Sequence, residues 1–241
     1  MKVKLFIFVL VVTVVPLLPT SSTAEDTGTL VRKQQERYTL SLELEFRKKN
    51  PNAFQKVVSV LDWGPNGYAS GFVVGDGLVM TAYHVVSGKL TLSKRAILGF
   101  GADDELRVTV HVNGCLANVV KIDEDADLAL LSVCHTGKEI RTPAFQTQLN
   151  KDEKLLLIAR PHGDKMISEG NFYGPYSFRG QEYWSARIDP REGYSGSPVY
   201  NRKAELIGVF SGYDWSQKLA VISTGSRAQK LLEGYVSSAK P

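Results

Sequence analysis

The feature that most limits how this chain can fold is a series of short apolar runs that begins near residue 57. The runs are VVSVL (57–61), GYASGFVVG (67–75), GLVMTAY (77–83), RVTVHVN (107–113), LANVVKI (116–122), LALLSV (128–133) and KLLLIAR (154–160). Glycine, proline, asparagine and aspartate separate them. Many short strands divided by turn residues are typical of antiparallel barrels or a sandwich. The sequence therefore predicts an all-β fold, built either as antiparallel barrels or as a sandwich.

The second half of the chain ends differently. STGSRAQKLLEGYV (223–236) has a helical pattern, and Ser226 is the expected N-cap. The hydrophobic pattern is weakest in HTGKEIRTPAFQT (135–147), which we interpret as the connection between two halves of similar size. We expect the first half of the domain over residues 57–140, and the second half with its C-terminal helix over residues 141–241.

Residues 1–24 have the composition of a secretory signal peptide. Lys2 and Lys4 precede an apolar run over residues 5–18, and small polar residues follow it up to Ala24. The run is shorter than the roughly 20 residues that span a bilayer. We expect cleavage after Ala24 and a secreted or periplasmic protein, with an uncleaved membrane anchor as the alternative.

The charge of the chain points to no particular class of partner. The formal net charge is +4, and loss of residues 1–24, which contain two lysines and no acidic residue, would leave +2. We expect no nucleic-acid partner and no stable membrane association after signal cleavage. Four scattered histidines lack metal-ligand spacing, so we expect no metal and no cofactor.

Residues 25–56 precede the main series of apolar runs. Within them, RYTLSLELEF (37–46) alternates apolar and polar side chains. This period of two predicts a half-buried strand, or else a poorly specified segment ahead of the main domain. We interpret residues 25–56 as an N-terminal extension or a propeptide.

The two cysteines flank a predicted hairpin. Cys115 and Cys134 lie symmetrically about the acidic turn DEDAD (123–127). Opposed residues of an antiparallel pair can approach closely enough for a disulfide, and an exported protein can keep one. The alternative is two small buried thiols.

Three further stretches carry residues that suit nucleophilic catalysis. TAYH ends at His84, DLAL begins at Asp127, and GYSGSP surrounds Ser195. In this order and spacing, on an all-β pattern, they resemble the trypsin-like (chymotrypsin-fold) serine proteases. The resemblance covers roughly residues 57–235. It is closest to the bacterial glutamyl-endopeptidase and HtrA-like branch, because GYSGSPVYN is followed by ELIGVFSG.

The resemblance implies two antiparallel six-stranded β-barrels, the first over residues 57–140 and the second over residues 141–241, with the active site between them. A serine hydroxyl is a weak nucleophile and needs a base within hydrogen-bond reach. By the resemblance His84 is that base, Asp127 orients its imidazole, and Ser195 attacks a peptide carbonyl. The backbone N–H groups of Gly193 and Ser195 would form the oxyanion hole. Ser211, Gly212 and Tyr213 would form the edge that pairs with the substrate backbone.

Other catalytic families fail on order or motif. In α/β-hydrolases a histidine follows the serine, whereas the last histidine here is His162. The subtilisin order is Asp, His, Ser, and that fold needs alternating helices that this pattern lacks. Neither cysteine lies in a cysteine-protease motif.

The chain departs from the resembled family at several positions. Tyr194 stands where the digestive branch has the aspartate that pairs with a newly cleaved N-terminus, so we expect no such activation switch. Asp189 lies six residues before Ser195, a spacing that selects Lys or Arg in the trypsin branch, although an HtrA-like loop would move it out of the pocket. The glutamate-selective branch of the resembled family uses a histidine on the strand after the serine. No histidine follows Ser195 here, so we do not expect glutamate specificity. The chain ends at Pro241, one helix past the last expected strand, so we expect no PDZ domain.

The leading hypothesis is an exported serine endopeptidase that acts on proteins or peptides through an acyl-enzyme. One alternative is a protease-fold protein that binds partners without cutting them. Another is an esterase that uses the same triad, because fold alone does not decide the substrate. The sequence leaves the natural substrate and the oligomeric state open.

Overall fold

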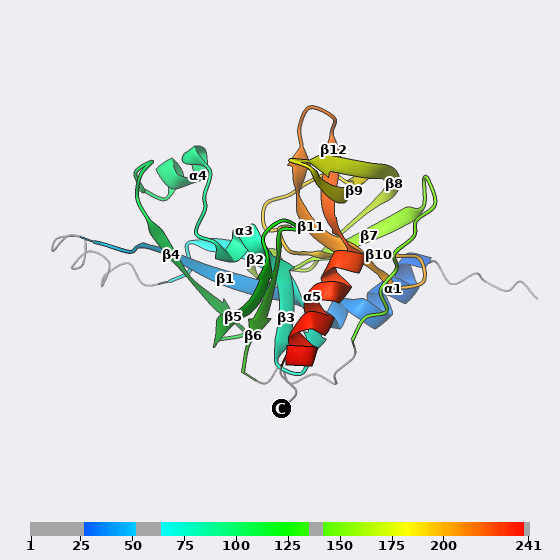
Figure 1. The fold of residues 1–241 in the computed structure, drawn as a ribbon, viewed down its shortest axis with the longest axis horizontal. Helices are drawn as coiled ribbons and strands as arrows, with labels where there is room; N and C mark the ends of the chain where they lie inside the picture. The colour runs from blue at the N-terminus through cyan, green and yellow to red at the C-terminus, as the bar shows by residue number, and fades with distance from the viewer. Residues whose placement is uncertain (1–26, 52–63, 135–141, 239–241) are drawn as a thin grey trace, which may run out of the picture.

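The structure, a computed structural model, describes residues 27–51, 64–134 and 142–238. These residues form two closed antiparallel barrels of six strands each, and a helix follows the second barrel (Figure 1). The all-β fold with two six-stranded barrels that the sequence predicts is confirmed.

The first barrel is closed because its first strand pairs with the second strand on one side and with the fourth strand on the other. In order around the barrel the strands are β1 (Thr39–Lys48), β2 (Gly67–Gly75), β3 (Leu78–Ala82), β6 (Leu128–Ser132), β5 (Cys115–Asp123) and β4 (Leu106–Val112). Successive strand side chains point to opposite faces. On β1 the apolar side chains of Leu40, Leu42, Leu44 and Phe46 are all buried, so the period-two pattern faces the barrel interior.

The boundary predicted at residue 57 is wrong, because β1 lies within the segment interpreted as an N-terminal extension. β1 pairs with β2 on one side and with β4 on the other, so the barrel closes only with it. Removal of residues 25–56 as a propeptide would therefore open the barrel. The strand expected at 57–61 lies outside the described residues and stays a prediction.

The second barrel is formed by strands between residues 154 and 224. In order around it lie β10 (Pro198–Asn201), β11 (Leu206–Asp214), β12 (Leu219–Thr224), β9 (Gln181–Arg187), β8 (Met166–Phe178) and β7 (Lys154–Ala159). The helix α5 (Gly225–Ser238) follows β12 directly. Thr224, rather than the expected Ser226, caps this helix, since its hydroxyl accepts a hydrogen bond from the N–H of Arg227 at 3.4 Å.

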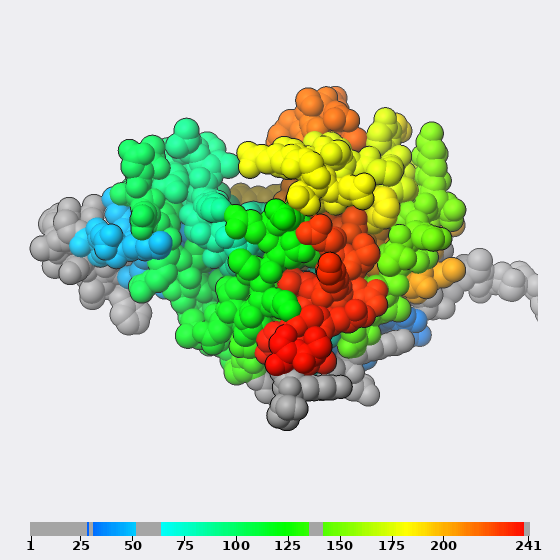
Figure 2. Space-filling model, viewed as in Figure 1, coloured from blue at the N-terminus to red at the C-terminus, as the bar shows by residue number. Residues whose placement is uncertain are grey.

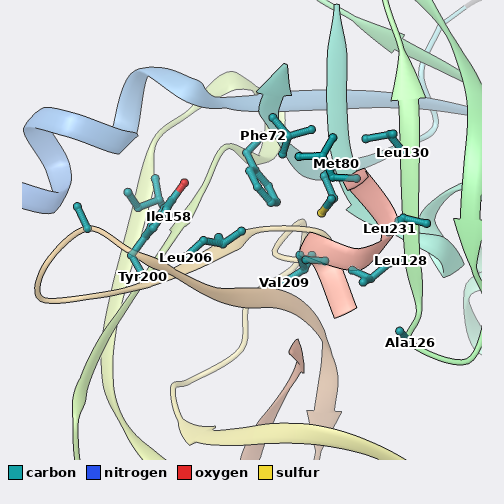
Figure 3. Close-up of a cluster of buried hydrophobic side chains, with 14 of the residues drawn as sticks. Phe72, Met80, Ala126, Leu128, Leu130, Ile158, Tyr200, Leu206, Val209 and Leu231 are labelled. Carbon is teal, nitrogen blue, oxygen red and sulfur yellow. The ribbon is translucent and has the colours of Figure 1, made fainter. Parts of the chain in front are cut away.

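A shared core joins the barrels. Strands of both barrels contribute buried side chains to it, and α5 contributes Leu231 (Figure 3). The labelled members are Phe72, Met80, Ala126, Leu128, Leu130, Ile158, Tyr200, Leu206, Val209 and Leu231. Because apolar burial is the main favourable contribution to folding, this core sets the relative position of the barrels and of any site between them.

The segment before β1 also packs on the second barrel. In α1 (Thr27–Gln35) the Val31 side chain is fully buried in the shared core, and Gln35 Nε2 donates to the carbonyl of Ala204 at 3.0 Å. The short helix η1 (Glu36–Tyr38) follows, and Glu36 lies 2.9 Å from the ammonium of Lys165. Within the described ranges no helix has the length and apolar character needed to cross a bilayer.

The predicted hairpin between the cysteines is also present. Cys115 begins β5, Cys134 follows β6, and the two strands are antiparallel neighbours. The two sulfurs are bonded, and the Cα atoms are 5.9 Å apart. The disulfide is therefore confirmed.

Candidate active site

His84 lies at the point where β3 leaves the first barrel. β3 ends at Ala82, and the single-turn helix α3 (Tyr83–Val86) starts at the next residue. Ala82 pairs with Leu128 on β6, so α3 begins beside the residue before Leu128, which is Asp127. The N–H of Tyr83 donates to the Asp127 carbonyl at 3.0 Å, and the N–H of His84 donates to Asp127 Oδ1 at 2.8 Å. Strand pairing thus brings the histidine and the aspartate together.

Asp127 is surrounded by hydrogen-bond donors. Its Oδ2 lies 2.8 Å from His84 Nδ1 and also accepts a hydrogen bond from the hydroxyl of Ser211 on β11. The side chain is only 15% exposed. Its φ of 52° lies in the left-handed region, which aspartate tolerates better than most residues but which still needs support from its surroundings.

Ser195 lies in the loop between β9 and β10, across the barrel interface from His84. Its Oγ is 2.8 Å from His84 Nε2. The next residue, Gly196, has a φ of 80°, and a Cβ there would overlap the Thr81 hydroxyl and the Ser70 carbonyl of the first barrel. Only glycine therefore lets the loop approach closely enough for this contact. The structure brings His84, Asp127 and Ser195 into one hydrogen-bonded series.

The residue two before the serine also has a special conformation. Gly193 has a φ of 82°, and a Cβ there would overlap the ring of Pro161. Within the part of the chain that the structure describes, neither the N–H of Gly193 nor that of Ser195 donates to an acceptor. Two such donors next to a nucleophile can receive a developing oxyanion.

A cleft of about 950 Å³ opens beside this series. Figure 2 shows the surface hollowed between the first barrel, near α4 (Leu92–Ile97), and the β8–β9 hairpin of the second. His84 and Asp127 line it, and so do Ser211, Gly212 and Tyr213 of β11. The three residues expected at the substrate edge therefore lie on the wall of the cleft.

Asp189 is exposed and follows β9 by two positions. The residues that line the cleft include none of Asp189, Gly193 and Ser195, so the lining does not separate Asp189 from the serine. Over the described ranges, no three His, Cys, Asp or Glu side chains group as metal ligands.

Sequence reasoning missed two tyrosines in the cleft wall. The Tyr183 hydroxyl donates to the carbonyl of Asp125 at 2.8 Å, and burial together with the nearby charge of Asp127 raises the pKa of Tyr183. The Tyr176 hydroxyl donates to Asp214 at 2.8 Å. Hydrogen bonds from Ser216 and Tyr176 lower the pKa of Asp214 to about 2. No local pattern could have found these contacts, because each tyrosine meets a partner on a distant element.

The chain is similar to curated and solved proteins. It is 26% identical over 153 residues to a glutamyl endopeptidase of Staphylococcus epidermidis, a match that covers 59% of this chain and 53% of that protein. The chain thus spans about half the length of this relative.

The fold has close matches among solved structures. The active form of the Rv3671c protease of M. tuberculosis superposes with a TM-score of 0.61 at 17% identity, covering 94% of this chain and 93% of that one. Deg5 superposes with a TM-score of 0.58 at 19% identity, covering 85% and 92%. At such identities these matches concern the fold.

A family model covers most of both barrels. Residues 69–209 match the trypsin-like peptidase domain, and this range includes His84, Asp127 and Ser195. The family resemblance drawn from the sequence is therefore confirmed. With more than half of its length inside the match, the chain belongs to the trypsin-like peptidase domain family.

Proposed function

We propose that this chain is a serine endopeptidase in which Ser195 is the nucleophile, His84 the general base and Asp127 the residue that orients the imidazole. One observation carries the proposal. Asp127 Oδ2 lies 2.8 Å from His84 Nδ1, and His84 Nε2 lies 2.8 Å from Ser195 Oγ. An imidazole held between a carboxylate and a hydroxyl in this way can take the hydroxyl proton as the oxygen attacks.

In the first half of the reaction, Ser195 Oγ forms a bond to the scissile carbonyl carbon while its proton passes to His84 Nε2. The carbonyl oxygen becomes an oxyanion that the N–H groups of Gly193 and Ser195 stabilise. Asp127 stabilises the imidazolium. The C–N bond then breaks, His84 gives the proton to the leaving amine, and the acyl group stays on Ser195.

In the second half, water attacks the acyl carbon, and His84 removes the proton of that water. The bond between the acyl carbon and Ser195 Oγ then breaks, and the proton returns to the serine. A carboxylic acid leaves and the enzyme is restored.

The substrate backbone would lie along β11. Beyond Val209, β11 pairs with β12 on one side, while β10 pairs only with its earlier residues. Ser211, Gly212 and Tyr213 also line the cleft. An extended peptide can add to such an edge as a further strand, which gives affinity through main-chain hydrogen bonds.

Two substrate preferences lack support. The glutamate-selective branch uses a histidine on the strand after the serine, and β11 contains no histidine. Asp189 is exposed, which does not favour a closed pocket for Lys or Arg around it. Digestion of a peptide library would measure the preference, and strong enrichment of Glu, Lys or Arg before the cut would contradict this interpretation.

Labelling with a fluorophosphonate probe tests the proposed activity. The probe should modify the wild-type chain at Ser195 and should leave Ser195→Ala unmodified, while the wild type hydrolyses a denatured protein substrate. Labelling without peptide cleavage would favour the esterase alternative. Absence of both in a folded protein would favour a protein that only binds its partners.

We also propose that the protein is exported after cleavage near Ala24. The composition of residues 1–24 supports this, and so does the Cys115–Cys134 disulfide, since disulfides persist in oxidising compartments. N-terminal sequencing of protein recovered from the medium or periplasm should find a chain that begins at Glu25. A mature chain that keeps residues 1–24 would support the membrane-anchor alternative.

A further inference from the structure

Ser70, on β2 of the first barrel, makes an unusual set of contacts with the loop that carries Ser195. Ser70 is fully buried. Its N–H donates to the Ser195 carbonyl at 2.9 Å, and its hydroxyl donates to the Gly193 carbonyl at 2.9 Å. The Ser70 carbonyl accepts a hydrogen bond from the Thr81 hydroxyl at 2.8 Å, which fixes Ser70 to β3. One residue of the first barrel thus binds the loop at both positions whose N–H groups the proposed reaction uses.

The same hydroxyl also binds a second segment of the second barrel. It accepts a hydrogen bond from the N–H of Arg160, directly after β7, at 2.9 Å. Arg160 precedes the turn η2 (Pro161–Gly163), and the ring of Pro161 occupies the space that a side chain at Gly193 would need. Ser70 and Pro161 therefore enclose Gly193 between two barrels.

Tyr194 fixes the residue between these two positions. Its side chain is 1% exposed and lies in the core of the second barrel, edge-on to Phe210 with ring centroids 6.3 Å apart. Its hydroxyl is 2.7 Å from the Ser168 hydroxyl on β8. A buried phenol that keeps its hydrogen bond resists displacement, because moving it would expose the ring and leave a polar group unpaired.

We infer that Ser70 and Tyr194 are positioning residues that keep the 193–195 loop in its reactive arrangement before any substrate binds. This inference rests on the proposed peptidase activity. Both residues act through the loop: Ser70 through the Gly193 and Ser195 carbonyls, Tyr194 through its anchorage on Ser168. The loop is then held by neutral hydrogen bonds from both barrels, and no newly cleaved N-terminus is needed to order it. Preorganised donors are effective because they need no rearrangement when charge develops.

Three single variants and one control test this inference. Ser70→Ala, Tyr194→Phe and Ser168→Ala each remove one hydroxyl from the network. Ser185→Ala is the control, because Ser185 is also a buried strand serine whose hydroxyl donates to a carbonyl, that of Gly174 at 2.8 Å, away from the loop. The double variant of Tyr194 and Ser168 should behave like either single variant, since both lack the same hydrogen bond.

Two readouts separate positioning from general stability. The first is amide hydrogen exchange in peptides that cover residues 189–197, followed by mass spectrometry. The second is kinetics, together with binding of a peptidyl boronate, in which Ser195 Oγ adds to boron and the resulting tetrahedral anion tests the oxyanion donors. We expect faster exchange in the loop for Ser70→Ala and Tyr194→Phe, and no change for Ser185→Ala.

The kinetic effect should fall on turnover. Ser70→Ala should lower kcat roughly ten- to hundredfold, somewhat less than the loss of an oxyanion donor itself. Tyr194→Phe should lower kcat about three- to tenfold, as expected for one buried hydrogen bond. Boronate affinity should fall with kcat, and KM should stay within about twofold.

Loop exchange at the wild-type rate in both Ser70→Ala and Tyr194→Phe would overturn the inference, and so would an equal loss of kcat in Ser185→Ala. If the loop exchanges faster but the wild type neither reacts with fluorophosphonate nor cleaves peptides, the positioning role stands and the proposed activity fails. If Ser70→Ala does not fold, Tyr194→Phe decides the question, because the substitution keeps the buried ring.

Discussion

The turn that carries Asp127 (residues 123–127, the acid turn) and the loop that carries Ser195 (residues 188–197, the serine loop) are each bound by residues of the other barrel or of α5. They are bound in different ways. The turn belongs to the first barrel, and three separate side chains from β9, β12 and α5 bind it. Their contacts are Tyr183 hydroxyl to Asp125 carbonyl, Ser223 hydroxyl to Ala126 carbonyl, and Arg227 guanidinium to Asp123 carboxylate. The acid turn is therefore fixed at several points by independent groups.

The serine loop belongs to the second barrel, and the Ser70 hydroxyl of the first barrel both donates to the Gly193 carbonyl and accepts from the N–H of Arg160. Contacts that share one hydroxyl are lost together, whereas contacts from separate side chains are lost one at a time. The difference indicates that single substitutions at the acid turn should be tolerated better than substitution of Ser70. Four substitutions, in order of decreasing effect, examine this contrast.

Replacement of the proposed nucleophile gives the largest expected loss of kcat, against which the losses from the two supporting regions are compared. Ser195→Ala should lower kcat by roughly a millionfold, because the attacking oxygen is removed while both supporting regions stay intact. Thermal unfolding should change little. Ser197→Ala is the matched control: Ser197 is buried in the same loop, and its hydroxyl has no partner within the described residues. Peptide hydrolysis measures both, and residual activity of Ser195→Ala near that of Ser197→Ala would refute the proposed nucleophile.

Loss of one anchor of the acid turn should cost less than loss of Ser70. Tyr183→Phe removes only the hydroxyl that donates to the Asp125 carbonyl, while the Ser223 and Arg227 contacts remain. We expect kcat to fall by at most about tenfold, in line with one hydrogen bond. Steady-state kinetics beside Ser70→Ala measures the contrast. A larger loss for Tyr183→Phe than for Ser70→Ala would reverse the proposed difference between the two regions.

The sequence predicts the strands β1 to β7 because each carries its own local pattern. It does not predict β8, whose residues are mostly not buried and form no apolar run. Period-two alternation on β1 and apolar runs bounded by turn residues on β2, β6 and β7 are visible in a few residues each. The error at residue 57 concerned assignment of β1 to the barrel, not its existence. Alternation indicates that a strand has one buried face, but the partner strands, such as β4, lie far along the chain.

The residues of the candidate site likewise fall into those that the sequence predicts and those that it does not. The stretches around His84, Asp127 and Ser195 are recognisable because short motifs surround them. Ser70 and Tyr183 carry no comparable signal, since their partners are 123 and 58 residues away in sequence. The sequence shows that Asp189 lies six residues before Ser195. It does not show the path of the loop between them, and that path decides where the Asp189 carboxylate lies.

The ion pair at the acid turn should show itself in the pH dependence of stability. Although partial burial opposes it, hydrogen bonds from Arg227 lower the pKa of Asp123 below its usual value. A folded-state pKa below the unfolded value, about 3.9, stabilises the fold above that pH, and the contribution disappears as the pH falls through the folded-state value. Arg227→Ala should therefore cost about 1 kcal/mol of unfolding free energy at pH 7, given side chains only 32% and 25% exposed.

Urea unfolding at pH 7 and at pH values below about 4 measures this. The difference between wild type and Arg227→Ala should shrink as the solution becomes more acidic. Lys89→Ala is the control, because its pair with Glu124 involves side chains 70% and 57% exposed and should contribute less. A difference that persists unchanged at low pH would show that Arg227 supports the turn by packing rather than by charge.

The smallest effect is expected at the rim of the cleft, which belongs to neither supported region. Trp215 is 76% exposed and stacks edge-on against Tyr213, with ring centroids 4.8 Å apart. A peptide paired with β11 advances about 3.3 Å per residue, so its side chains reach Trp215 only about four residues from Ser211. Trp215→Ala should lower kcat/KM about threefold for long peptides through lost apolar contact, and should leave short peptides and kcat unchanged. An equal loss of kcat/KM with short and long peptides would instead show that Trp215 influences the catalytic groups through the acid turn or the serine loop. Residues that position the catalytic groups and residues that bind the substrate would then not be separate.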